Sequence, residues 1–179
     1  MRWRFAALLG LLLASPAAAA DWRFEHAGVP GAFSDNGTAQ LDFTCRGGEL
    51  VLGFWVRAAE PGVAKAAAMN LSITPDGGGP SFAQDMPLIH GDGTMMVVRG
   101  PVARQWAAIA QRAKSTLQVA FVHRNARGAL ETYNANTFGA AGSSAAIRQV
   151  LDRCGRGGHW PSGSWGGVVF TPPELRQGR

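Results

Sequence analysis

The sequence predicts an α+β fold: a mainly antiparallel sheet or small β-sandwich of six to eight strands, with two helices. Three observations predict it. Apolar residues alternate along several short segments, two other segments repeat their apolar residues at helical spacing, and 24 glycines and 10 prolines supply frequent turns. Since 46% of the 179 residues are hydrophobic and 16% are charged, the chain can build one packed domain, which we place at 21–157.

The first twenty residues, 1–20, are typical of a secretory signal peptide. They combine a positively charged start, an apolar stretch at 5–14 that is too short to cross a bilayer, and the small residues Ala18 and Ala20. We expect cleavage directly after Ala20. The mature protein is then exported, periplasmic or extracellular, with no further transmembrane segment.

The N-terminal part of the mature chain predicts strands. Asp21–Glu25 is expected to form a short strand, and the Gly- and Pro-rich segment 28–37 a loop. The strongest signal is a hairpin of 41–45 and 50–56, joined by the turn Gly47-Gly48. The two-residue turn sets the cross-strand pairs, which are Arg46 with Glu49, Cys45 with Leu50, Thr44 with Val51, Phe43 with Leu52, and Leu41 with Phe54.

Trp55 falls on the opposite face of this hairpin from the paired apolar residues, because side chains alternate along a strand. Two interpretations stay open. Trp55 could be an exposed aromatic residue on a ligand or partner surface, or it could join Trp106 in a second core against a helix.

The central part of the chain predicts further strands and the first helix. Alternating apolar residues indicate strands at 69–73, 94–99, 115–123 and 129–138, and helical spacing with Pro101 in the first turn indicates a helix over 101–113. The last two strands form a second hairpin. Because its loop could have three or four residues, the face on which Tyr133 lies stays open.

The last element is predicted to be a helix over 143–154, with Ser143 as its N-cap and Gly155 as its end. Cys154 lies on the apolar stripe of this helix, and Cys45 on the inward face of its strand. Two cysteines in an exported chain predict one disulfide, Cys45–Cys154, that fastens the last helix to the first hairpin. Residues 158–179 are expected to form a flexible Gly- and Pro-rich tail that carries Trp160 and Trp165.

Two motifs around the cysteines resemble a known class of proteins. They read Leu41-x-Phe43-x-Cys45 and Phe138-x-x-x-Gly142-x-x-x-Ala146-Ile147-x-x-x-Leu151-x-x-Cys154-Gly155. The pattern is similar to that of small exported accessory proteins associated with bacterial type VI secretion, and to other two-cysteine periplasmic domains. The glycines at 77–79 and the tail are not part of it. The resemblance implies an accessory or structural protein with no catalytic residue.

The composition and motifs argue against several functions. The mature chain has 15 basic and 12 acidic residues, and its basic residues form no run, which argues against nucleic-acid binding. The four histidines lie in separate segments without zinc-site spacing. No nucleophile elbow, paired carboxylates or phosphate-binding glycine loop stands out. We therefore expect no catalytic residues, no cofactor and no metal.

The remaining candidates for function are aromatic side chains that could contact a partner: Trp55, Tyr133, Trp160 and Trp165. We expect a non-enzymatic exported accessory or binding protein of the bacterial cell envelope, in contact with an envelope or secreted protein, as in a secretion system. The alternatives are a secreted inhibitor or host-interaction factor and, third, an envelope hydrolase.

Overall fold

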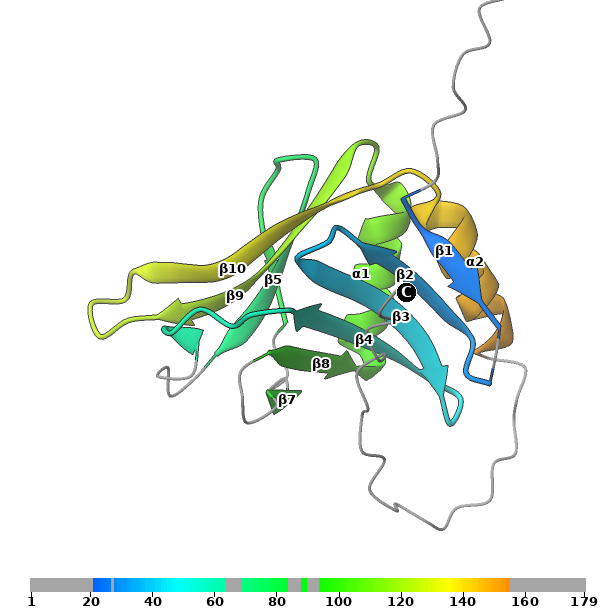
Figure 1. Cartoon of the computed structure of the whole chain (residues 1–179), viewed down its shortest axis with the longest axis horizontal. Coiled ribbons are helices and arrows are strands. Elements are labelled where there is room, and N and C mark those ends of the chain that lie inside the picture. Colours follow the sequence, from blue (N-terminus) through cyan, green and yellow to red (C-terminus); the bar gives the residue numbers. More distant parts are fainter. Residues whose placement is uncertain (1–20, 27, 64–68, 84–87, 90–93, 155–179) are drawn as a thin grey trace, which may run out of the picture.

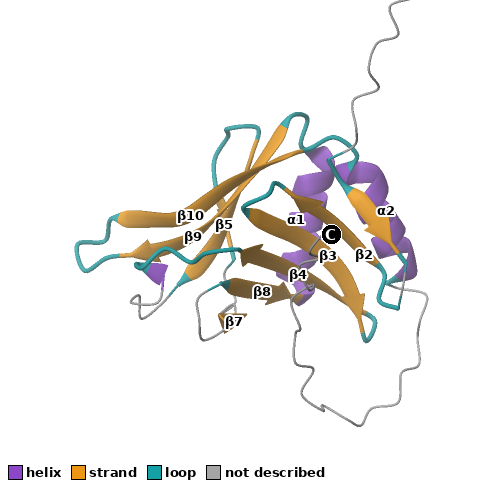
Figure 2. Cartoon of the chain, in the orientation of Figure 1, coloured by secondary structure: helices purple, strands orange, loops and turns teal. Residues whose placement is uncertain are grey.

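The computed structural model describes residues 21–26, 28–63, 69–83, 88–89 and 94–154. The signal peptide and the tail with Trp160 and Trp165 lie outside these residues. The described chain forms two antiparallel sheets and two helices, which confirms the predicted fold class (Figures 1 and 2).

The larger sheet, sheet A, has six strands. In spatial order they are β1 (Arg23–Glu25), β2 (Gly31–Asp35), β3 (Ala39–Arg46), β4 (Glu49–Val56), β8 (Met95–Arg99) and β7 (Leu88–Ile89). The smaller sheet, sheet B, has four. They are β10 (Leu130–Gly139), β9 (Thr116–Arg124), β5 (Asn70–Pro75) and β6 (Ser81–Phe82). The helices are α1 (Gly100–Arg112) and α2 (Ser143–Arg153).

The predicted first hairpin is confirmed residue by residue. β3 and β4 pair in the expected register, from Leu41 opposite Phe54 to Arg46 opposite Glu49. Gly47 and Gly48 both have positive φ angles, +58° and +81°, as a tight two-residue turn between twisted strands requires.

The loop predicted at 28–37 is wrong, because Gly31–Asp35 forms β2 and pairs with both β1 and β3. The inward side chains of β2 are the fully buried Ala32 and the nearly buried Ser34, and α2 packs over them. A close helix leaves room only for small side chains, so the segment lacks the large apolar residues by which a strand is normally recognised. The strands β6 and β7 were not predicted either, and each has only two residues.

One core lies between the two sheets and the helices, which pack behind sheet A in the view of Figure 1. Phe54 of β4 reaches across to sheet B, with its ring centroid 5.1 Å from that of Phe121 and 6.4 Å from that of Phe138. Trp106 of α1 is fully buried in the same core. Trp55 belongs to a separate cluster, so the predicted second core of Trp55 with Trp106 is wrong.

Helix α2 differs from its prediction at the N-terminus. Gly142, with φ +85°, occupies the N-cap position, and Ser143 is the first helical residue, so Ser143 as N-cap is wrong. The Ser143 hydroxyl instead donates a hydrogen bond of 2.8 Å to the carbonyl oxygen of Ala110 in α1. This buried bond fixes one helix against the other.

The predicted disulfide is present. Cys45 of β3 and Cys154 at the end of α2 are bonded, with their Cα atoms 5.3 Å apart and 109 positions between them in sequence. The bridge therefore joins the final helix to the first hairpin, as the sequence predicts.

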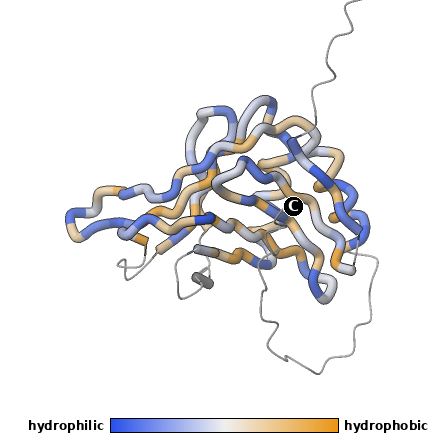
Figure 3. Tube along the Cα trace, viewed as in Figure 1, coloured by the Kyte–Doolittle hydropathy of each residue, from blue (hydrophilic) through white to orange (hydrophobic). Residues whose placement is uncertain are grey.

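The second hairpin, β9–β10, extends away from the body (Figure 1), and its tip is hydrophilic (Figure 3). Its loop spans 125–129, longer than expected, and a bulge follows between Tyr133 and Asn136. Within the described ranges, no helix has the length and apolar character to cross a membrane.

Candidate functional site

The most distinctive surface of the described chain is the outer face of sheet A, opposite the core. Cross-strand pairing arranges its side chains in three rows across β2, β3, β4 and β8. The rows are Asp35–Gln40–Trp55–Met95, Phe33–Asp42–Gly53–Val97 and Gly31–Thr44–Val51–Arg99.

An apolar cluster occupies the β4 and β8 side of this face. Val51, Met95 and Val97 pack together with the half-buried Trp55, separately from the main core. Met95 and its neighbour Met96 point to opposite faces, so Met96 lies in the main core instead. In the described residues both helices and sheet B pack on the other side of sheet A.

Asp42 lies in the middle row, half-buried, with its carboxylate directly over Gly53. A Cβ atom at residue 53 would collide with that carboxylate, so glycine is what leaves room for it. Among the described residues the carboxylate accepts no hydrogen bond. Burial raises the pKa of Asp42 to about 7, although the positive charge of Arg46 acts in the opposite direction.

This raised pKa predicts a stability that depends on pH. Because the folded protein binds the Asp42 proton more tightly than the unfolded chain does, Asp42 costs stability progressively as pH rises from about 4 to 7. We expect Asp42→Asn to unfold at a higher temperature than the wild type at pH 8 and at nearly the same temperature at pH 4. Thermal melts of both proteins at the two pH values check this. An equal difference at both pH values would contradict it.

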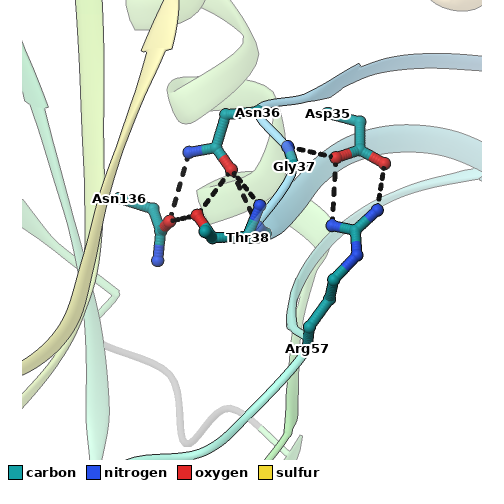
Figure 4. A network of polar contacts seen from close by, with 7 residues as sticks. Asp35, Asn36, Gly37, Thr38, Arg57 and Asn136 are labelled. Atoms are coloured by element: carbon teal, nitrogen blue, oxygen red, sulfur yellow. Dashed lines mark hydrogen bonds and ion pairs between the residues drawn. The ribbon is translucent and has the colours of Figure 1, made fainter.

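The carboxylate of Asp35, in the neighbouring row of this face, is paired with Arg57. Arg57 donates two hydrogen bonds to Asp35, of 2.9 and 3.2 Å, and these hold the pKa of Asp35 below its usual value (Figure 4). The guanidinium of Arg57 also lies 5.4 Å from the ring centroid of Trp55. Asp35, Arg57 and Trp55 thus form one connected edge of the outer face.

A polar network beside this edge ties sheet A to sheet B (Figure 4). The side-chain oxygen of Asn36 accepts hydrogen bonds from the backbone N–H groups of Thr38 and Ala39, and its amide donates to Asn136 and Thr137 of β10. The Thr38 hydroxyl donates to the side-chain oxygen of Asn136 over 2.6 Å. These bonds hold the β2–β3 turn rigidly.

A pocket of about 610 Å³ opens next to the network. Its lining includes Arg23, Phe33, Asp35, Arg57 and Phe138. Phe33 and Asp35 belong to the outer face of sheet A, whereas Phe138 belongs to β10 and the main core, so the pocket lies at the junction of the two sheets. Asp35 and Arg57 pair with each other there.

Two of the four predicted partner-contact residues, Trp55 and Tyr133, lie in the part of the chain that the structure describes. Trp55 lies on the outer face of sheet A, whereas Tyr133 lies on β10, packs against the main core and covers Gly62 with its ring. The Tyr133 hydroxyl donates a hydrogen bond of 2.7 Å to Glu131, which raises the pKa of Tyr133. Trp160 and Trp165 lie outside the described residues.

The sequence patterns did not single out Asp42, Arg57 or Asp35. A signal for Asp42 existed, since the predicted register of β3 and β4 places it opposite Gly53, the one position where a facing side chain is absent. No comparable signal marks the pair of Arg57 with Asp35. The two residues are 22 positions apart, and Asp35 lies in the segment 28–37, for which the sequence predicts a loop.

In the described residues, no three His, Cys, Asp or Glu side chains gather as a metal site would need. No protein-family model, curated protein or solved structure matches this chain.

Proposed function

We propose that this protein is an exported, non-enzymatic binding or accessory protein of the cell envelope, and that it holds a protein partner on the outer face of sheet A. The observation that carries the proposal is the cluster of Val51, Met95, Val97 and Trp55, which lies on the side of the sheet away from the core. Val51, Met95 and Val97 are 5–8% exposed, so the half-buried Trp55 is the member of the cluster that a partner could contact, and tryptophan is enriched among the residues that dominate binding at interfaces.

The residue types on this face support binding. Tryptophan, methionine and arginine are enriched at protein interfaces, and here Trp55, Met95 and Arg57 lie together. The surrounding strands are held by the Asn36 network, so little conformational entropy is lost when a partner docks.

Two features support export. A disulfide is typical of oxidising compartments, and Cys45–Cys154 is bonded. In addition, the residues directly after Ala20 are held in the fold. Trp22 is only 3% exposed, and its indole N–H donates a hydrogen bond of 2.9 Å to the carbonyl oxygen of Gly139. A mature chain that begins at Asp21 therefore keeps this anchor.

A site-specific photo-crosslinker tests the proposal. We would place p-benzoylphenylalanine at Gln40, in the first row of the outer face, and at Gln149, on the exposed side of α2. After irradiation of cells that export the protein, we expect adducts of a discrete mass from position 40 and none from position 149. Mass spectrometry of the adducts identifies the partner.

The matched variant adds Trp55→Ala to the protein that carries the crosslinker at position 40. We expect it to lower the adduct yield at least tenfold, because it removes the central aromatic contact without touching the main core. Adducts of equal yield from both positions, or an undiminished yield in Trp55→Ala, would place the interaction elsewhere.

A further inference from the structure

We propose that the pocket at the junction of the two sheets binds a sugar, one or two units of a neutral glycan. This inference goes beyond the proposed function, because the pocket is lined by other residues than Trp55 and its cluster. It follows from the size of the pocket, from the side chains that line it and from the contacts that fix those side chains.

Four separate parts of the chain form the pocket. Sheet A contributes the segment 33–37, from β2 and the turn after it, and Arg57, which follows β4. Asp21 and Arg23 contribute from the start of the described chain, and residues 138–139 from the end of β10. The volume of about 610 Å³ lies within the range of small-molecule sites, roughly 300–1,000 Å³, so the pocket can take a ligand of one or two sugar units.

The polar groups of the pocket include both signs of charge. Asp21 and Arg23 line it from the start of the chain, and Asp35 and Arg57 line it as an ion pair of 2.9 Å. A ligand with a single charge would meet a like charge close to each opposite one. A hydroxyl group both donates and accepts hydrogen bonds, so a neutral ligand with many hydroxyl groups can bind carboxylates and guanidinium groups together. Sugars are ligands of this kind.

The shapes of the lining groups also suit a sugar. Carboxylate and guanidinium groups are planar and present two hydrogen-bonding positions side by side, which two neighbouring hydroxyl groups of a sugar ring can occupy. The ring of Phe33 offers an apolar surface for the C–H face of the sugar, because it is half-buried, whereas Phe138 is 1% exposed. Phe33 stands opposite Arg23 in the pairing of β1 with β2, so an apolar and a polar contact are available next to each other.

The lining is fixed in place without a ligand. Arg57 holds Asp35 with two hydrogen bonds, and the backbone N–H of Gly37 donates a further bond of 2.7 Å to the same carboxylate (Figure 4). The amide of Asn36 fastens the turn to β10. Little side-chain entropy is therefore lost on binding. A purely apolar ligand would instead displace water from the charged pair without replacing its hydrogen bonds, which argues against lipids.

A glycan array tests the inference. The labelled mature protein is applied to an array that holds neutral and acidic glycans from bacteria, plants and animals. We expect binding to a group of neutral glycans that share one or two sugar units. The glycan that binds best is then titrated into the protein and followed by NMR, and we expect it to shift the backbone amides of 33–37, Arg57 and Gly139.

Two variants and a matched control show whether the pocket carries the binding. Arg23→Gln removes a charge of the lining at an exposed position, and Phe33→Ala removes the half-buried ring. We expect each to weaken binding of that glycan about tenfold, the usual effect of losing a hydrogen bond to a charged group or an aromatic contact. The control is Arg127→Gln, which removes the same charge from the exposed loop of the second hairpin and should bind as the wild type does. Thermal melts report whether each variant is folded.

Several results would overturn the inference. They are the absence of binding to any glycan of the array, binding of acidic glycans alone, and shifts confined to other parts of the molecule. Undiminished affinity in Arg23→Gln and Phe33→Ala would also reject the sugar site, and Arg23→Gln decides alone if Phe33→Ala does not fold. The crosslinking yields from Gln40 and Gln149 decide the proposed function independently.

Discussion

Replacing Cys154 with serine should lower the melting temperature by roughly 10–20 °C, while unfolding stays cooperative. The Cys45–Cys154 bridge closes a loop of 109 positions, and in the chain-entropy model a loop of that size stabilises the fold by about 4–5 kcal/mol. The effect acts on the unfolded chain, which gains freedom when the bridge is lost. Differential scanning calorimetry of both proteins under non-reducing conditions measures it.

The double variant Cys45→Ser/Cys154→Ser is the matched control. It should melt at the same temperature as the single variant, because both lack the same bridge. If the melting temperature of Cys154→Ser equalled that of the wild type, and both wild-type thiols reacted with a thiol reagent in the folded protein, the bridge would not exist.

Replacing Phe54 with alanine should destabilise the protein by about 3–5 kcal/mol, as is usual when a large buried aromatic side chain is removed. Phe54 is fully buried and is the residue of sheet A whose ring contacts Phe121 and Phe138 of sheet B. Its loss leaves a cavity between the two sheets and removes both ring contacts. Urea unfolding followed by circular dichroism measures the change.

Trp55→Ala provides a control from the adjacent residue. Trp55 is the larger side chain, but it is half-buried on the outer face, so its removal leaves no enclosed cavity. We expect it to cost at most about half as much as Phe54→Ala. If the two substitutions cost the same, the outer face would be as tightly packed as the core, and its assignment as a binding surface would fail.

The parts of the fold that follow from local rules were predictable from the sequence. Two glycines between alternating apolar segments are enough to define the β3–β4 register, and the redox argument is enough to pair Cys45 with Cys154. The register rests on the short-range geometry of a two-residue turn, and two cysteines can form only one intramolecular pair. Helix α1 was likewise predictable, because Pro101 and the spacing of its apolar residues agree.

The parts that depend on tertiary neighbours were not predictable. β2 is recognised as a strand only when its partners β1 and β3 and the helix above it are known. Ser143 looks like an N-cap until α1 supplies Ala110 as a better acceptor for its hydroxyl. The same holds for Asp76, whose carboxylate accepts hydrogen bonds from the backbone N–H groups of 114–116, nearly forty positions away.

The candidate site, too, was predictable only where local rules apply. Alternation along β4 correctly placed Trp55 on the face opposite the paired apolar residues. It could not show that Met95 and Val97 join Trp55, because the residues that pair between β4 and β8 are 40 or more positions apart and no turn defines their register. Nor could it show that Arg57 pairs with Asp35.

Intact-mass analysis of the protein recovered from outside the cytoplasm tests the central claim most directly, namely that this is an exported domain closed by one internal bridge. We predict a chain that starts at Asp21 and has a mass two hydrogens below that of the reduced form. A chain that still starts at Met1, or one that carries two free thiols, would contradict both the export and the covalent link between α2 and β3.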